Sequence, residues 1–283
     1  MPYVIDMQDP WHTDYYKHRP KHERPPKYWF SYNLNKYLEP IAIKNADGLI
    51  SVSQKYLNDL NERYPELNQK NQKVITFGYS DIDLKIAQQV EMPHNSKKTL
   101  LYFGVLGPMM RKSLDLLFRN LPEKMKTEFQ LVFKGTSYAG GKKANKTTVE
   151  FQHKYQLKNI EEQSDRIGMF QVLKELSIAN GLLIIGTDDS GYTASKLYPY
   201  LQVRKPILAI LHPDSSANKI LKENSNAVII NLEDSDGQVK RKLSTFITMI
   251  ENNSNVLYEK NFLNFSARTL TERQCELFDS LTY

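Results

Sequence analysis

The chain has 283 residues, of which 40% are hydrophobic and 25% charged, and its single cysteine excludes an intrachain disulfide. This length suits about two domains, and the composition excludes collagen-like, disulfide-rich and low-complexity proteins. Apolar runs stay well short of the roughly 18 residues of a membrane span. Acidic residues close to the N-terminus argue against a secretory signal peptide. We therefore expect a cytoplasmic α/β protein.

The net charge of +6 is unevenly distributed. Residues 96–160 carry 13 basic and 4 acidic side chains, whereas residues 1–95 are neutral overall and residues 161–283 have a net charge of −3. A local basic region favours an anionic partner, such as a phosphate group or an acidic membrane surface. A solvated lysine-rich face is the plain alternative. No base-reading motif accompanies the lysines, so we expect no nucleic-acid partner.

Short apolar runs alternate with longer amphipathic stretches, as in parallel α/β sheets. The first part of the chain is predicted to contain strands over 3–5, 48–52 and 74–77 and helices over 29–44 and 54–63. The polar stretch 84–97 predicts the boundary between one domain of residues 1–95 and another of residues 96–283. Three strands are few for an independent sheet of this type.

The second domain is predicted to be a nearly complete doubly wound sheet. Its strands are expected over 99–103, 130–133, 182–185, 207–211 and 227–230. Its helices are expected over 113–119, 147–155, 170–178, 195–201 and 216–222, with mostly helix after residue 239 and a loop over 139–143.

Two segments that follow predicted strands carry candidate anion-binding groups. After the strand 99–103, a turn with Gly104 and Gly107 leads to a helix that begins with Arg111 and Lys112. Glycine lets backbone amides approach a phosphate, and cations at a helix start are unfavourable unless an anion is bound. A turn that only reverses the chain is the alternative.

The second segment follows the strand 182–185, at the carboxyl edge where open α/β sheets bind ligands. The amides of Thr193, Ala194 and Ser195, together with Lys196, form a candidate site for a diphosphate. Plain helix capping with a surface lysine is the alternative. The histidines offer no closed set of metal ligands, and Walker A and G-x-G-x-x-G motifs are absent, so we expect neither metal nor cofactor.

Several segments resemble the GT-B glycosyltransferases, in particular glycosyltransferase family 4. The stretch Ser-Lys-Leu-Tyr-Pro-Tyr-Leu at 195–201, followed by Arg-Lys-Pro-Ile-Leu-Ala at 204–209, is similar to the donor-site helix and next strand of that family. Residues 46–53 resemble the last strand of its N-terminal domain, residues 73–83 resemble the segment before its hinge, and residues 6–11 resemble its Asp-Arg-Asp-Pro-Trp sequence.

The resemblance implies two Rossmann-like domains, with a nucleotide-sugar donor in the second. It implies transfer of a sugar, with retention of its anomeric configuration, to a glycan or lipid-linked acceptor in surface polysaccharide or glycoconjugate synthesis. Lys196 and Arg111 would neutralise the departing diphosphate, and the amides at 193–195 would hold its terminal phosphate. Base-binding segments would lie near Gly135 and residues 166–169. The basic region would allow a peripheral membrane contact.

Two departures from the family pattern leave alternatives open. Gly191 and Pro199 stand where members often carry glutamates, the second of which contacts the ribose. The first part of the N-terminal domain is also missing, so we expect a fragment, a shortened protein or a sheet completed by a second chain. The alternative to a glycosyltransferase is therefore a catalytically silent nucleotide-sugar-binding fragment or partner subunit.

Overall fold

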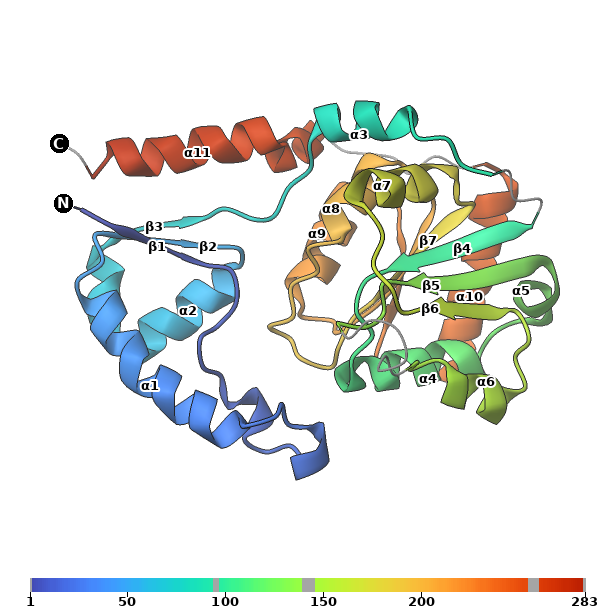
Figure 1. Ribbon diagram of the computed structural model, residues 1–283, viewed down its shortest axis with the longest axis horizontal. Helices are drawn as coiled ribbons and strands as arrows, with labels where there is room; N and C mark the ends of the chain where they lie inside the picture. The colour runs from blue at the N-terminus through green and yellow to red at the C-terminus, as the bar shows by residue number, and fades with distance from the viewer. Residues whose placement is uncertain (1, 94–96, 139–145, 254–259, 282–283) are drawn as a thin grey trace. The chain divides into compact units, whose positions relative to one another are not determined.

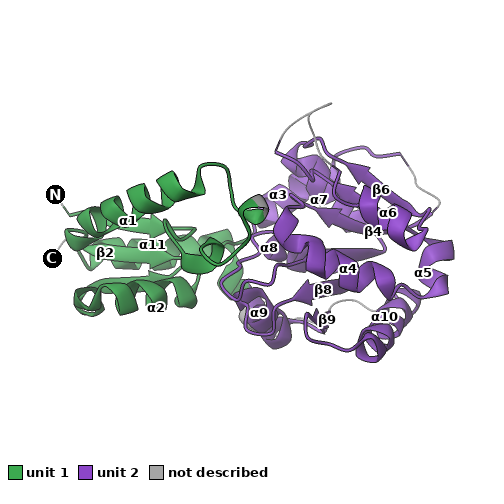
Figure 2. Ribbon diagram, turned by 90° about the horizontal axis from the view of Figure 1, so that it is seen from below, with its two compact units in different colours: residues 1–78, 263–283 green, residues 79–262 purple. Residues whose placement is uncertain are grey.

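The computed structural model describes residues 2–93, 97–138, 146–253 and 260–281. It divides into two compact units, unit 1 with residues 1–78 and 263–283 and unit 2 with residues 79–262 (Figure 2). The domain boundary expected at residues 95 and 96 and the loop expected over 139–143 lie outside the described residues.

Unit 1 is built on a parallel sheet of three strands in the order β1-β2-β3. The strands are β1 (Val4–Met7), β2 (Gly48–Ser51) and β3 (Asn71–Val74). The connecting helices α1 (Tyr28–Lys44) and α2 (Gln54–Arg63) lie on one face of the sheet (Figure 1). Ser53 begins α2 as predicted, because its hydroxyl accepts a hydrogen bond from the Lys55 amide at 3.2 Å. Short 3-10 turns span Asp14–Tyr16, Lys21–Glu23 and Pro65–Gln69.

The C-terminal helix α11 (Ala267–Asp279) belongs to unit 1, whereas the sequence analysis assigned all residues after 96 to the second domain. It lies on the face of the sheet opposite α1 and α2 (Figure 1). Lys73 of β3 forms an ion pair with Glu276 at 2.7 Å. A Cβ atom at Gly78 would come within 2.5 Å of the Leu270 side chain, so the chain after β3 packs closely on α11.

Unit 2 contains a sheet of six strands in the order β6-β5-β4-β7-β8-β9, all of them parallel. The strands are β4 (Lys98–Phe103), β5 (Phe129–Lys134), β6 (Ile160–Gln163), β7 (Gly181–Ile185), β8 (Ile207–Leu211) and β9 (Val228–Asn231). The helices are α3 (Asp81–Gln88), α4 (Arg111–Arg119), α5 (Glu123–Glu128), α6 (Val149–Tyr155), α7 (Met169–Ile178), α8 (Leu197–Gln202), α9 (Ser216–Asn224) and α10 (Asp236–Glu251). Figure 1 shows α4 and α6 on one face of this sheet and α7 and α8 on the other.

The centre of the core lies at β7 and β8, in which every residue is buried. Such continuous apolar strands are typical of parallel sheets covered by helices on both faces. Each fully buried leucine or isoleucine contributes roughly 1.5–3 kcal/mol to folding, so this pair of strands fixes the frame on which the neighbouring loops are held.

The structure differs from the sequence expectations at several elements. The strand expected over 74–77 is β3, which begins at Asn71 because its register pairs Asn71 with Gly48 and Val74 with Ser51. The sequence analysis missed β6, where Glu162 is buried and its carboxylate accepts 2.7 Å hydrogen bonds from the Thr148 amide and hydroxyl. The helix expected to begin at residue 195 is α8, which begins at Leu197.

Candidate functional site

The strand order of unit 2 reverses between β4 and β7. The sheet grows from β4 through β5 to β6 in one direction and from β7 through β8 to β9 in the other. Open α/β sheets bind their ligands outside the carboxyl ends of the two strands at such a switch point. The two segments that the sequence analysis selected, which begin at Gly104 and Gly186, follow these two strands directly.

Gly104 ends β4 in a backbone conformation that favours glycine. Its φ is +138°, and its amide donates a hydrogen bond to the Lys134 carbonyl of β5 at 3.0 Å. A Cβ atom at this position would lie 2.5 Å from the Lys196 ammonium nitrogen. The glycine therefore allows the side chain of Lys196 to lie directly against the end of β4.

The carboxyl end of β7 is tied to α4. The hydroxyl of Ser113, buried in α4, donates a 2.7 Å hydrogen bond to the Gly186 carbonyl. In the loop that follows, the Asp189 carboxylate accepts a hydrogen bond from the Gly191 amide at 2.8 Å. These contacts hold the loop at the sheet edge on its way to Lys196.

Lys196 is part-buried, and its ammonium group is turned inward toward the end of β4. The ammonium donates a 2.7 Å hydrogen bond to the Tyr102 hydroxyl and lies 4.3 Å from the centre of that ring. Among the described residues no carboxylate forms an ion pair with it. Desolvation lowers the pKa of Lys196 to about 7, because burial disfavours the charged form.

Two tyrosines that the sequence analysis did not place in the site hold this lysine. The buried Tyr102 hydroxyl accepts from Lys196 and donates to the Val105 carbonyl at 2.9 Å. The Tyr200 hydroxyl, one helical turn after Lys196, accepts a 2.7 Å hydrogen bond from the Phe103 amide. Burial raises the pKa of both phenols, so both stay protonated.

Thr193, Ala194 and Ser195 lie in the turn that precedes α8. Ala194 is buried, Thr193 is half-buried and Ser195 is exposed. The Ala194 carbonyl accepts from the Leu197 amide at 3.0 Å, which closes the turn beside Lys196. The structure thus gathers these residues, Lys196 and Gly104 at one sheet edge.

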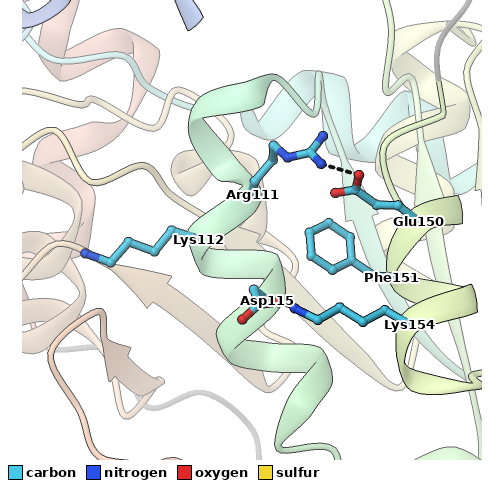
Figure 3. Close-up of a pocket in the computed structure, with 6 residues that line it drawn as sticks. All are labelled: Arg111, Lys112, Asp115, Glu150, Phe151 and Lys154. Carbon is cyan, nitrogen blue, oxygen red and sulfur yellow. Dashed lines mark hydrogen bonds and ion pairs between the residues drawn. The ribbon is translucent and has the colours of Figure 1, made fainter. Parts of the chain in front are cut away.

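The other predicted site residues lie around the start of α4 and the end of β5. Gly107 precedes a short 3-10 turn, Pro108–Met110, and a side chain there would meet open space. Gly135 follows β5 with a φ of +65°. Arg111 and Lys112 begin α4 and point to opposite sides of it (Figure 3).

Arg111 is engaged by an acid. Its guanidinium forms an ion pair with Glu150 of α6 beside the Phe151 ring (Figure 3). A cavity of about 460 Å³ lies here, lined by Arg111, Lys112, Asp115, Glu150, Phe151 and Lys154. Lys154 pairs with Asp115 at 2.7 Å, so carboxylates compensate much of the basic charge in this cavity. The Glu150 carboxylate offsets the charge of the Arg111 guanidinium and would compete with a phosphate for it.

Comparisons with known proteins agree with this description of the fold. No family model and no curated protein sequence matches the chain. Among solved structures, HepE from Anabaena in complex with UDP-glucose superposes with a TM-score of 0.65 and 16% identity, over 99% of this chain and 72% of HepE. Sucrose-phosphate synthase from Thermosynechococcus elongatus gives a TM-score of 0.63 and 11% identity, over 98% and 67%.

A trehalose-6-phosphate synthase from Burkholderia multivorans gives a TM-score of 0.64 and 12% identity, over 99% of this chain and 66% of that one. The chain has the GT-B fold. At these identities the fold is what is shared, and the chain spans about two thirds of the length of these structures. The expected α/β architecture with two Rossmann-like parallel sheets is confirmed.

Proposed function

We propose that the protein is a glycosyltransferase that binds a nucleotide sugar in unit 2. The observation that carries this proposal is Lys196, an inward-turned ammonium at the switch point between β4 and β7 that lacks a carboxylate partner among the described residues. A buried cation without a counter-charge is costly, and a bound anion would remove that cost. The GT-B neighbours, one of which holds UDP-glucose, favour a nucleotide diphosphate as that anion.

Charge builds up on the diphosphate as the bond to the sugar breaks. A cation held in place before the reaction stabilises this charge without reorganisation, and therefore lowers the barrier. Lys196 would supply it, and the amides of Thr193, Ala194 and Ser195 would hold the terminal phosphate. Gly104 and Gly107 would let the backbone approach the donor, and Gly135 would lie near the base. Arg111 would add a second cation after leaving Glu150, and Lys112 would add positive charge on the other side of α4.

The acceptor side of the proposal rests on the family resemblance. We propose a glycan or lipid-linked acceptor, transfer with retention, a cytoplasmic location and a role in surface polysaccharide or glycoconjugate synthesis. This reaction would need no metal or other cofactor. A second chain that extends the sheet of unit 1 at β1 is part of the same proposal, because within the described residues β1 pairs on one side only.

A silent nucleotide-sugar-binding protein is the second candidate. It is favoured by Gly191 and Pro199, which replace the two glutamates that family 4 members often carry. Product formation separates the two candidates. The protein is incubated with UDP-glucose and related donors, and release of the nucleoside diphosphate is measured with and without glycan acceptors. Release that is lost in Lys196→Met supports the transferase, whereas binding without release supports the silent protein.

A further inference from the structure

The connection between β1 and α1 is long for an α/β unit. It comprises residues 8–27, whereas such connections usually have about two to six residues. Two hydrogen bonds attach it to α1. The side-chain amide of Asn35 donates one of 2.7 Å to the Trp11 carbonyl. The Tyr32 hydroxyl donates one of 2.6 Å to the Asp14 carboxylate. The connecting segment is therefore held on α1 at two points that are close together in the chain.

His12 lies between these two attachment points and is buried, with 8% of its surface exposed. Its ring meets the Tyr32 ring edge to face, with the ring centres 5.6 Å apart. Its Nδ1 atom lies 3.3 Å from the Oε1 atom of Glu39 but has no hydrogen-bond partner among the described residues. A protonated imidazole carries two N–H donors, so in this arrangement at least one of them would be buried and unsatisfied. The docked segment therefore suits the neutral ring.

The Glu39 carboxylate is held by other groups. Its Oε1 atom accepts hydrogen bonds from Arg63 of α2 at 3.0 Å and from the Tyr64 hydroxyl at 3.2 Å. Its Oε2 atom is buried and, within the described part of the chain, has no partner. A hydrogen bond from protonated His12 to Oε2 would therefore need one of the two side chains to move. Because the carboxylate is held, we expect the His12 ring to turn, and turning breaks its contact with Tyr32.

The charges around His12 balance one another. Two acids attract a positive ring and two bases repel it, and they come from α1, α2 and the turn after His12: Glu39, Asp14, Arg63 and Lys36. The nearby phenols stay uncharged, because a hydrogen bond to Asp14 raises the pKa of Tyr32 to about 12 and burial raises that of Tyr64. Desolvation outweighs the attraction of Glu39 and lowers the pKa of His12 below its usual 6.5. A proton on His12 would therefore add a positive charge that these groups do not offset.

We propose that His12 is a pH-sensitive latch, which holds residues 8–27 on α1 at neutral pH and releases them in mild acid. Histidine is the side chain whose charge normally changes between about pH 5 and 8. Protonation would turn the ring away from Tyr32 or draw it toward water, because a buried cation without a partner is costly. The same Tyr32 side chain donates to Asp14, so the movement would reach the second attachment point. The latch belongs to unit 1 alone and does not depend on donor binding in unit 2.

The direction of the pH effect follows from the difference between the docked and the released ring. The released ring has the usual pKa of 6.5 and the docked ring a lower one, so between these values the released segment binds more protons. Docking is therefore at full strength above pH 6.5 and weakens as the pH falls from 6.5 toward the pKa of the docked ring. At one pH unit below 6.5, docking can weaken by at most about tenfold.

Amide hydrogen exchange of the full chain, read by mass spectrometry at about pH 7.5 and 5.5 and corrected for the intrinsic effect of pH, tests the latch. We expect peptides from residues 8–27 to exchange about three- to tenfold faster at the lower pH, whereas peptides from β7 and β8 should not change. In His12→Gln, which cannot take up the proton, this pH dependence should disappear. The matched control is His18→Gln, which removes an exposed histidine of the same segment and should keep the pH dependence.

A direct titration covers the case in which His12→Gln opens the segment at both pH values. The C–H signal of the His12 ring, assigned by its loss in His12→Gln, is followed by NMR in the wild type. Titration of His12 below pH 6.5, together with faster exchange of residues 8–27 in acid, supports the latch. Three results would overturn it: exchange that is unchanged or slower in acid, a pH dependence that survives in His12→Gln, or titration of His12 above pH 6.5.

Discussion

Replacing Lys196 by methionine should make the protein more stable while it removes the donor site. Methionine keeps the length of the side chain and removes the charge. The pKa of Lys196 falls from 10.5 to about 7 on folding because of desolvation. At about 1.4 kcal/mol for each unit of pKa, the buried ammonium costs at most about 4 kcal/mol at pH 7. The variant also loses the hydrogen bond to Tyr102, worth about 1 kcal/mol, so we expect a net gain of about 1–3 kcal/mol.

The same shift predicts how stability depends on pH. Between pH 7 and 10.5 the unfolded chain keeps its lysine proton while the folded protein has largely lost it. Stability rises with pH wherever the unfolded state binds more protons, so the wild type should gain stability across this window from Lys196. In Lys196→Met this contribution is absent, and the advantage of the variant should shrink as the pH approaches 10.

Urea unfolding at pH 7 and at pH 9.5 measures both effects. The control is Lys219→Met, which removes a lysine with a 76% exposed side chain and should change stability by less than about 0.5 kcal/mol. A Lys196→Met variant that is less stable than the wild type at pH 7 would refute the reasoning. It would mean that the ammonium gains more from its surroundings than it loses by desolvation.

Three further predictions concern residues that hold this site and unit 1. Tyr102→Phe removes the hydroxyl that accepts a hydrogen bond from the Lys196 ammonium, so the affinity for the nucleotide sugar at pH 7.5 should fall roughly tenfold. Binding measured at several pH values should also show that the pH profile of this affinity moves to lower pH. Gly104→Ala places a methyl group against the Lys196 ammonium, at a residue with a φ of +138°, and should weaken binding of the nucleotide sugar at least tenfold. The control is Gly237→Ala in α10, where the added methyl group meets open space, and it should leave binding unchanged. Glu39→Gln removes the charge that faces Arg63 and should lower the free energy of unfolding by about 1–3 kcal/mol in urea titrations, and an unchanged midpoint would show that the buried pair contributes nothing.

The elements that sequence predicted well are those with a local signal. Strand β7 is predicted by its continuous apolar run, and the start of α2 is predicted by the serine that caps it. Both signals lie within a few neighbouring residues of the chain. Strand β6 was missed because Glu162 sits where an apolar residue is expected, and its partners at Thr147 and Thr148 come from another element. A buried acid that depends on distant donors carries no local pattern.

The candidate site was partly predictable for a similar reason. Lys196 and Gly104 stand out in sequence, since each follows a strand at the sheet edge. Their contact, in contrast, joins residues 92 positions apart and depends on the strand order that sets β4 beside β7. The same holds for Tyr102, whose role depends on which side chain reaches its hydroxyl. The pairing of Arg111 with Glu150 likewise depends on how α6 lies beside α4.

Calorimetric titration with UDP-glucose near pH 8, in two buffers of different ionisation enthalpy, tests the central claim most directly. Lys196 is mostly neutral at that pH in the free protein, and an anion beside its nitrogen would restore the charge. We therefore expect saturable binding with uptake of close to one proton in the wild type, and weaker binding without uptake in Lys196→Met. Equal affinity in the two proteins would contradict the assignment of Lys196 to the diphosphate. Failure of UDP, GDP and their sugar conjugates to bind would contradict the donor site itself.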